Sequence, residues 1–296
     1  MNLLQAIILG IVQGLTEFIP ISSTAHLVFA SRWLSLYGGN AEQTTATIAV
    51  IQLGTLIAVL IYFAPDILGI SVAFIRDHWA VITRRRGLRF SGTNGVRPMW
   101  LSAEAWLGWL IIIGSIPIGT LGLLLKKQIE GPATKNLWVI ATMMIVVAIL
   151  LWIAEKTGSQ RKGLNELGIS DALIVGFSQV LALMPGSSRS GSTIMGGLFA
   201  GEKRETAARF SFLLSIPAIM ASGLLELKQS LSLLPQESFT PLAVGTVVSA
   251  VVGYASIWFL LRFLKKNSTL VFIVYRIIVG TAILGFLYYG IISPQV

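Results

Sequence analysis

The sequence predicts an all-α integral membrane protein with six transmembrane helices and two re-entrant helical hairpins that form an inverted-topology repeat. Of the 296 residues, 54% are hydrophobic and only 12% are charged, whereas roughly 25% are charged in a typical soluble domain. Six apolar stretches are long enough to span a bilayer, and two shorter, related segments are each broken by a proline. This composition excludes an ordinary soluble enzyme, a disordered protein and a nucleic-acid-binding module.

The six long stretches lie at about residues 45–63, 105–125, 136–154, 207–225, 242–261 and 270–291. Each is expected to cross alone, because one crossing needs about 20 apolar residues. We assign the chain to a single polytopic membrane domain, 1–296, with repeat one at about 1–154 and repeat two at about 171–296. The apolar N-terminus is not expected to be a cleavable signal peptide, because no basic residue precedes it. The absence of cysteine excludes thiolate chemistry.

The remaining apolar residues form two pairs of short segments. Residues 3–36 are interrupted by Pro20, and residues 171–200 are interrupted by Pro185. Each pair is too long for one crossing and too short for two helices and a turn. Half-inserted hairpins solve this problem, provided that the irregular backbone at each break lines a cavity within the protein.

Basic residues test this topology, because Lys and Arg accumulate in cytoplasmic loops. With both pairs re-entrant, 15 loop Lys and Arg residues lie on one side of the membrane and 5 on the other, whereas a single crossing at 171–200 makes the division 10 and 10. The net charge of +9 therefore reflects topology, and both termini are expected outside the cytoplasm. The connection 64–104 is expected to be a cytoplasmic basic loop with an interfacial amphipathic helix over 67–83.

Related residues occur in the two hairpins. With one gap, the matched positions are Ala6, Gly10, Gln13, Leu15, Pro20, Ser22 and Ser23 in the first and Ala172, Gly176, Gln179, Leu181, Pro185, Ser187 and Ser188 in the second. Gly10 and Gly14 allow another helix to approach closely. Since the first hairpin enters from outside and the second from the cytoplasm, the repeat is predicted to be inverted. Such repeats build a ligand site where their broken helices meet near the membrane midplane.

The first hairpin supplies an acid and an imidazole. Gln13 and Glu17 lie on one helical face, because they are four residues apart. The polar residues after the break are Ser22, Ser23, Thr24 and His26. A charged group at the bilayer centre costs roughly 2.5–3.5 kcal/mol, which favours a functional role for Glu17 and His26.

The second hairpin carries the run P-G-S-S-R-S-G-S-T at 185–193. Gly186 allows a tight turn, the start of the following helix presents amides to an anion, and Arg189 can hold two oxygens at once. The hydroxyl donors are Ser187, Ser188, Ser190 and Thr193. No Gly-Lys-Ser/Thr follows, so the run is not a nucleotide-binding P-loop. It predicts an anion cradle.

Each candidate also has a structural interpretation. Glu17 could form a purely structural ion pair with Arg189 or Arg276, and His26 could be a hydrogen-bonded polar residue at the interface. The serines at the breaks could be plain helix N-caps. That role is compatible with an anion site, because a capped helix N-terminus still offers free N–H groups.

Two motifs resemble those of a known family: Q-G-L-T-E-F-I-P-I-S-S-T-A-H at 13–26 and P-G-S-S-R-S-G-S-T at 185–193. The resemblance extends to I-Q-L-G at 51–54, F-S-F-L-L-S-I-P at 210–217 and Y-R-I-I-V at 275–279, and so covers nearly the whole chain. The family that the chain resembles is that of the bacterial undecaprenyl-diphosphate phosphatases of the bacitracin-resistance type. Its acidic motif is Glu or Gln, three residues, then Glu; here the first position is Gln13. Ala25 replaces the glycine that commonly precedes the histidine.

The resemblance implies hydrolysis of the terminal phosphate of a C55 polyprenyl diphosphate, which gives the monophosphate carrier of cell-wall synthesis and confers bacitracin resistance. It also implies a divalent metal (magnesium or calcium), for which Gln13 and Glu17 are the candidate ligands. The expected location is the bacterial cell (inner) membrane, with an active site facing the extracytoplasmic side. The expected partners are the polyprenyl diphosphate lipid and the membrane, with no nucleic acid.

Phosphoryl transfer requires neutralisation of charge on the phosphate oxygens. We expect Arg189 to supply the main contact to the diphosphate. The further substrate-binding candidates are Ser22, Thr24, Gly186, Ser187, Ser188, Ser190, Thr193 and Arg276. For Arg276, the alternative is that it balances the charge of Glu17.

The reaction also needs a positioned nucleophile. Glu17 is expected to hold the cation or act as base, with Gln13 orienting it or a metal-bound water. His26 is the expected nucleophile or general acid–base, and Ser23 and water are the alternative nucleophiles. The alternative function is an alternating-access transporter of an anion or lipid phosphate, because inverted repeats with broken helices are typical of such proteins.

Overall fold

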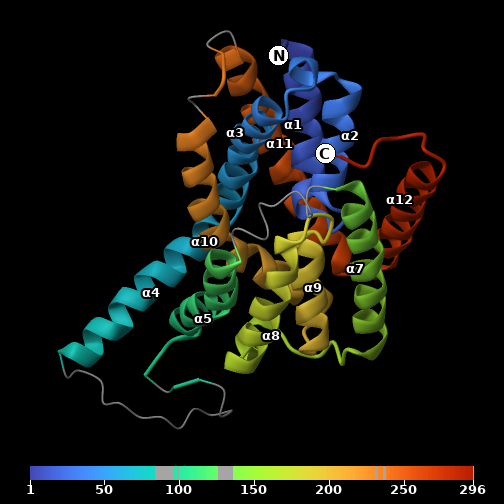
Figure 1. Ribbon diagram of the computed structural model, residues 1–296. Coiled ribbons are helices and arrows are strands. Elements are labelled where there is room, and N and C mark those ends of the chain that lie inside the picture. The colour runs from blue at the N-terminus through green and yellow to red at the C-terminus, as the bar shows by residue number, and fades with distance from the viewer. Residues whose placement is uncertain (84–96, 99, 126–135, 231–232, 236–237, 296) are drawn as a thin grey trace.

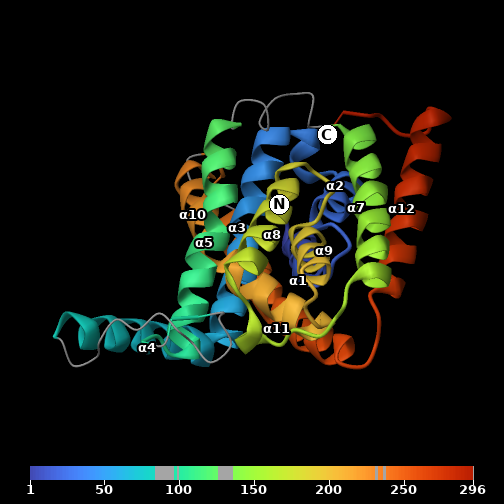
Figure 2. The ribbon, with the colours of Figure 1, turned by 90° about the horizontal axis from the view of Figure 1, so that it is seen from below.

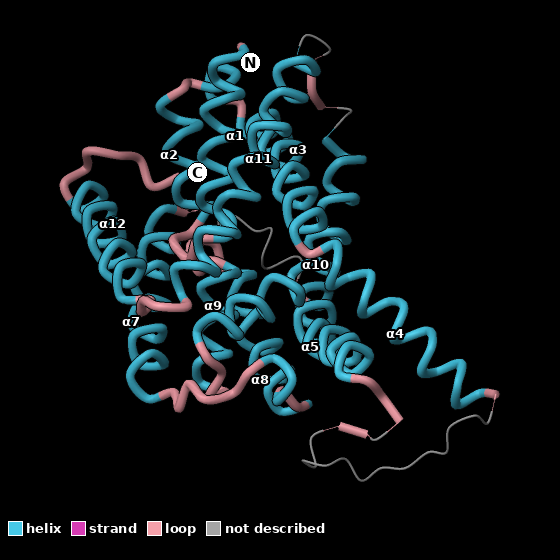
Figure 3. Tube along the Cα trace, turned by 180° about the vertical axis from the view of Figure 1, so that it is seen from behind, coloured by secondary structure: helices cyan, strands magenta, loops and turns pink. Residues whose placement is uncertain are grey.

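The computed structural model describes residues 1–83, 97–98, 100–125, 136–230, 233–235 and 238–295. Within these ranges the chain is helical and contains no β-strand (Figure 3). The α-helices are α1 (Leu3–Phe18), α2 (Ser23–Trp33), α3 (Ala41–Tyr62), α4 (Ala64–Ile82), α5 (Ala103–Leu124), α7 (Leu137–Thr157), α8 (Ile169–Val180), α9 (Arg189–Phe199), α10 (Arg204–Ser230), α11 (Phe239–Leu264) and α12 (Leu270–Tyr288). Short 3-10 helices occupy Leu36–Gly39, Leu164–Glu166 and Leu181–Leu183.

Six helices are long and apolar enough to cross a membrane: α3, α5, α7, α10 over Arg204–Gly223, α11 and α12. They coincide with the six predicted crossings, which confirms a multi-pass membrane protein. Asn40, Ser102 and Asn136 accept hydrogen bonds from first-turn amides of α3, α5 and α7. Asparagine and serine are favoured at these positions because their side chains satisfy amides that the helix leaves free.

The four predicted short segments are helices as well, namely α1, α2, α8 and α9. Glycines hold them against long helices. A Cβ atom on Gly10 of α1 would lie 2.4 Å from the carbonyl oxygen of Gly245 in α11, and one on Gly176 of α8 would lie 2.3 Å from that of Gly114 in α5. Small residues allow this backbone approach within membranes, so each broken helix is anchored to a crossing helix.

Figures 1 and 2 show how the elements are arranged. The N-terminus lies at the top of the molecule and the connection from α7 to α8 lies at the bottom (Figure 1). Seen from below, α1 and α9 lie in the middle of the molecule, with α5 on one side and α7 and α12 on the other (Figure 2). The breaks after α1 and before α9 are therefore inside the protein.

Helix α4 projects away from the bundle (Figures 1 and 2). It covers most of 67–83, where a helix was predicted, and residues 84–96 of the predicted loop lie outside the described residues. Large apolar side chains of α4 are exposed, among them Leu68, Ile75 and Trp79. Near the far end of α4, Asp77 accepts a hydrogen bond from the amide of Ser102, the N-cap of α5, at 2.7 Å. Helix α4 therefore has exposed apolar side chains and is linked to the start of α5.

Candidate active site

The two breaks have the same construction. Ser22 precedes α2 with φ +79°, and its Oγ accepts a hydrogen bond from the Ala25 amide at 3.5 Å. Ser188 precedes α9 with φ +67°, and its Oγ accepts one from the Gly191 amide at 3.2 Å. A non-glycine residue in such a conformation costs about 1–3 kcal/mol and persists only where the surroundings enforce it. Ser22 and Ser188 are thus N-caps held in a strained backbone.

Gly186 forms the tight turn predicted before α9. Its φ is +94°, and a Cβ atom there would lie 2.2 Å from the carbonyl oxygen of Ile140. Only glycine fits this position, since any side chain would meet the backbone of α7.

An ion pair joins the breaks. Nη2 of Arg189, the first residue of α9, donates to Oε1 of Glu17 in the last turn of α1. The Glu17 side chain is 6% exposed and that of Arg189 is 20% exposed. The predicted meeting of these two residues is therefore confirmed, and the arginine is the partner that solvent or a ligand can reach.

Gln13 supports the carboxylate. Its Nε2 donates to Glu17 Oε2 at 3.0 Å and to Thr55 Oγ1 at 3.4 Å. Its Oε1 is buried and has no hydrogen-bond partner among the described residues. Gln13 and Glu17, which are hydrogen-bonded to each other, thus offer an amide oxygen and a carboxylate as possible metal ligands. No group of three His, Asp or Glu side chains in the described ranges could hold a metal.

His26 has both ring nitrogens engaged. Nδ1 lies 2.7 Å from the Ser22 carbonyl oxygen, and Nε2 lies 2.6 Å from the Tyr275 hydroxyl oxygen. The two rings are stacked, with centroids 5.7 Å apart and planes 12° apart. A carbonyl only accepts, so Nδ1 carries the proton and Nε2 of the neutral ring keeps its lone pair. His26 is therefore held as a base.

The remaining hydroxyl candidates divide by burial. Ser187, Ser190 and Thr193 are buried. The Ser187 hydroxyl donates to the Met184 carbonyl at 2.7 Å, and that of Thr193 donates to the Arg189 carbonyl at 2.8 Å. These two hydroxyls stabilise the break and the first turn of α9. The accessible candidates are Ser23, Thr24 and Ser188.

Arg276 was expected either to contact the substrate or to balance the charge of Glu17, and its environment in the structure differs from both. It is fully buried, and its guanidinium donates only to backbone carbonyls in the described part of the chain: those of Pro20, Met143, Met144, Gly186 and Ser187. A buried charge must be compensated by such contacts. In this structure Arg276 therefore contacts neither Glu17 nor the accessible part of the site; it ties the two breaks to each other and to α7.

Tyr275 was missed at the sequence level. It lies in the segment Y-R-I-I-V, but its partner His26 is 249 residues away. No local pattern reveals such a contact. The only signal was its position beside Arg276, a charged residue inside an apolar helix.

Comparisons with known proteins identify the family of this chain. The family model described as bacitracin resistance protein BacA matches residues 6–282. The chain belongs to this family. All of the candidate residues lie within the matched region of the BacA model.

Several proteins similar to this chain over its whole length are named undecaprenyl-diphosphatase. One from Syntrophobacter fumaroxidans is 52% identical over 285 residues, which cover 96% of this chain and 97% of the relative. One from Myxococcus xanthus is 46% identical, covering 100% and 92% of the two chains. One from Chlorobium limicola is 46% identical, covering 99% of each. The similarity therefore extends over whole chains.

Proposed function

We propose that this BacA-family protein is a membrane-embedded hydrolase that removes the terminal phosphate of undecaprenyl diphosphate to give undecaprenyl phosphate. The reaction recycles the lipid carrier of cell-wall synthesis and thereby confers bacitracin resistance. The observation that carries the proposal is the ion pair of Glu17 and Arg189 between two broken helices. It places an acid and an anion-binding cation together inside a membrane protein. The transporter alternative is not favoured, because the relatives are named for the phosphatase activity.

The diphosphate binds to Arg189. The planar guanidinium can hold two phosphate oxygens at once, and it is the more exposed member of the ion pair. Because Arg189 begins α9, the free amides of the first helical turn add to its attraction for an anion. Ser188 and Ser23 add hydroxyls beside the starts of α9 and α2.

His26 takes a proton from the attacking water. The water oxygen bonds to the terminal phosphorus, the bond from that phosphorus to the bridging oxygen breaks, and the electron pair leaves with the lipid monophosphate. His26 Nε2 accepts the proton that the water gives up. Water rather than Ser23 is the nucleophile in this mechanism, because no hydrogen bond joins the Ser23 hydroxyl to His26 among the described residues.

A divalent cation, magnesium or calcium, suits the oxygen donors beside Arg189. Proteins bind magnesium through one or two carboxylates together with substrate phosphates. Glu17 provides a carboxylate, and the buried Oε1 of Gln13 has no other partner among the described residues. Gln13 and Glu17 would therefore hold the cation, which would neutralise charge on the phosphates when bound.

The two hairpins form an inverted repeat of re-entrant helices. In support, one separation of 166 residues relates the starts of α1 and α8, Leu3 and Ile169, and those of α2 and α9, Ser23 and Arg189. The N-caps Ser22 and Ser188 are also separated by 166 residues. The sequence match that paired Ser22 with Ser187 was therefore wrong by one residue. The helices α1 and α2 occupy one half of the bundle and α8 and α9 the other half (Figure 1).

The protein resides in the bacterial inner membrane, with its active site open to the extracytoplasmic side. The excess of basic loop residues on one side supports this orientation, because basic loops stay in the cytoplasm. In this topology the chain termini are extracytoplasmic and α4 is cytoplasmic.

The test is phosphate release by the purified, detergent-solubilised protein. Wild type is expected to release inorganic phosphate from undecaprenyl and farnesyl diphosphates, and a chelator is expected to abolish the release. Glu17→Gln should lower kcat/KM by about 10²–10³, the usual effect of removing one preorganised charge contact. Lipid crossing liposomes without phosphate release would overturn the hydrolase proposal. A labelled phosphoenzyme isolated after acid quenching would contradict direct attack by water.

A further inference from the structure

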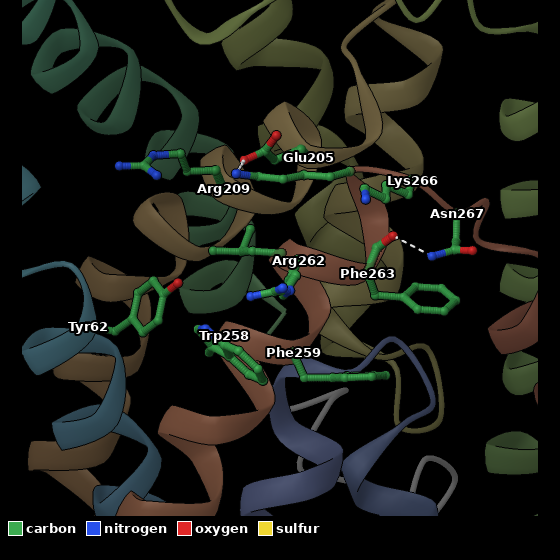
Figure 4. Close-up of a pocket in the computed structure, with 11 residues that line it drawn as sticks. Tyr62, Glu205, Arg209, Trp258, Phe259, Arg262, Phe263, Lys266 and Asn267 are labelled. Carbon is green, nitrogen blue, oxygen red and sulfur yellow. Dashed lines mark hydrogen bonds and ion pairs between the residues drawn. The ribbon is translucent and has the colours of Figure 1, made fainter.

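A cavity of about 720 Å³ lies outside the site described above, where α3 and α11 end and α10 begins (Figure 4). Its volume falls in the range of small-molecule binding sites, roughly 300–1,000 Å³. None of its lining residues belongs to the candidate active site. These helix ends adjoin the basic connections, so the cavity opens at the basic end of the molecule.

The cavity carries excess positive charge. Its lining includes the cations Arg209, Arg262, Lys265 and Lys266 and one carboxylate, Glu205. Arg209 is paired with Asp66 at 2.6 Å, and Lys265 is paired with Glu205 at 3.1 Å. The Arg262 guanidinium instead lies over the Trp258 ring, 5.5 Å from its centroid. Neither Arg262 nor Lys266 has a carboxylate partner in the described ranges, which leaves two uncompensated positive charges.

The other walls are aromatic. Tyr62, Trp258, Phe259 and Phe263 line the cavity (Figure 4). Trp258 is 50% exposed and Phe259 is 44% exposed on the membrane-crossing helix α11. A free inorganic anion has no apolar part that could pack against these aromatic side chains. A lipid, in contrast, places its chain along apolar surface and its head group among cations. The cavity thus combines cations for a lipid head group with aromatic surface for a lipid chain.

General loop charge does not explain this arrangement. Arg161 and Lys203 are basic residues of the same end of the molecule, but they are exposed and do not line the cavity. Arg262 and Lys266 are instead gathered with two paired cations around one concave, aromatic surface.

We propose that this cavity binds a membrane lipid with a terminal phosphomonoester head group, in the leaflet at the basic end of the protein. A phosphomonoester carries about −1.5 to −2 charges at neutral pH, which matches the two uncompensated cations, whereas a phosphodiester lipid carries one. Arg262 and Lys266 contact the phosphate, and Trp258 and Phe259 contact the first part of the chain. The proposal does not depend on the hydrolase function.

The test is native mass spectrometry of the full-length protein in detergent with defined lipids. The lipids are dioleoyl phosphatidic acid, undecaprenyl phosphate and, as the diester, dioleoyl phosphatidylglycerol. Arg189→Lys is present throughout, which weakens the binding of a lipid phosphate at the candidate active site and keeps the charge opposite Glu17. The cavity variant is R262Q/K266Q. Its matched control, R161Q/K203Q, removes the same charge from the same end of the protein.

The phosphomonoester lipids are expected to bind about tenfold more tightly than the diester, and R262Q/K266Q is expected to lose about tenfold in affinity while R161Q/K203Q loses none. Binding of both phosphomonoesters supports recognition of the head group alone, and binding of only undecaprenyl phosphate supports a site for the prenyl carrier. Equal binding of phosphatidylglycerol, or equal loss in both double variants, would overturn the proposal. In an otherwise wild-type background, R262Q/K266Q should hydrolyse farnesyl diphosphate at the unchanged rate, which shows that it is folded.

Discussion

Glu17 and Arg189 compensate each other's charge in a largely buried position. Removing one member of a buried pair leaves an uncompensated charge and typically costs about 3–5 kcal/mol of stability. Alanine substitutions at either residue therefore mix a loss of stability with a loss of function. Substitutions that keep the charge and change its geometry separate the two.

Arg189→Lys is the first such substitution. We expect it to lower kcat/KM by about 10²–10³, nearly as much as Arg189→Ala, because an ammonium group cannot reproduce the two parallel hydrogen bonds of guanidinium. Its melting temperature should stay close to that of wild type, since the charge opposite Glu17 is kept. Phosphate release from farnesyl diphosphate and thermal unfolding in detergent measure both effects. Near-wild-type release by the lysine variant would exclude the clamp role.

Tyr275 is expected to position His26 without touching the substrate. Tyr275→Phe keeps the stacked ring and removes the hydroxyl that lies 2.6 Å from Nε2. One hydrogen bond is worth about 0.5–1.5 kcal/mol, so kcat should fall roughly 3–10-fold with KM unchanged, and the pH profile of kcat should shift. Tyr289→Phe, a change at an exposed tyrosine, is the control. A changed KM with constant kcat would instead place Tyr275 in contact with the lipid.

At the scale of helices, the site depends on two short elements that end inside the protein. Their terminal carbonyls and amides need partners. Arg276 satisfies the carbonyls of Pro20 and Gly186, one at each break. Glycine contacts then fix the helices, as Gly176 of α8 does on α5. The position of Arg189 is therefore determined by residues far from it in sequence.

The packing of α8 can be tested at one glycine. Gly176→Ala is expected to lower stability by about 1–3 kcal/mol, because its methyl group would force α8 away from Gly114. The matched control is Gly119→Ala on α5, where a Cβ atom meets nothing within 4 Å. The control should be neutral or slightly stabilising. Thermal unfolding in detergent compares the two, and equal melting temperatures would show that this contact does not hold α8.

For the whole molecule, the connection from α9 to α10 contains a carboxyl group that the proposed reaction does not use. Glu202 is fully buried, and neither of its oxygens has a hydrogen-bond partner among the described residues. Burial raises the pKa of Glu202 from 4.5 to about 8, and the negative charge of Asp171 adds to this effect. The folded protein therefore holds a proton that the unfolded chain releases between these two pH values.

Stability should consequently fall as pH rises from about 4.5 to 8, because the folded state binds more protons there. Glu202→Gln removes this dependence. We expect the variant to match wild type near pH 4 and to be more stable at pH 9 by on the order of 5 kcal/mol. Thermal unfolding across this pH range measures it, with the exposed Glu104→Gln as control. Parallel pH curves for wild type and Glu202→Gln would show that Glu202 is not protonated in the folded protein.

Much of this architecture was predictable. Crossing helices are set by the length and hydropathy of local stretches, so all six were found. The meeting of Glu17 and Arg189 was expected from the two related hairpins, because the broken helices of such repeats meet near the membrane midplane. The partners of Arg276 and the contact of Tyr275 with His26 were not predictable, because a guanidinium accepts many arrangements of oxygen and these residues are far apart in sequence. The sequence match aligned the two breaks on their prolines and so paired Ser22 with Ser187. In the structure the residues with positive φ that cap the following helices are Ser22 and Ser188.

The sequence by itself determined the class of protein, the number of crossings, the two broken segments and the residues able to bind a phosphate, because these depend on composition and on local spacing. Tertiary structure decided which hydroxyls remain accessible, which nitrogen of His26 keeps its lone pair, and that Arg276 stabilises the backbone of the breaks. Those properties depend on which surfaces come into contact when helices pack. A buried polar group cannot form a hydrogen bond with water, so its partner is determined by the groups that helix packing places beside it.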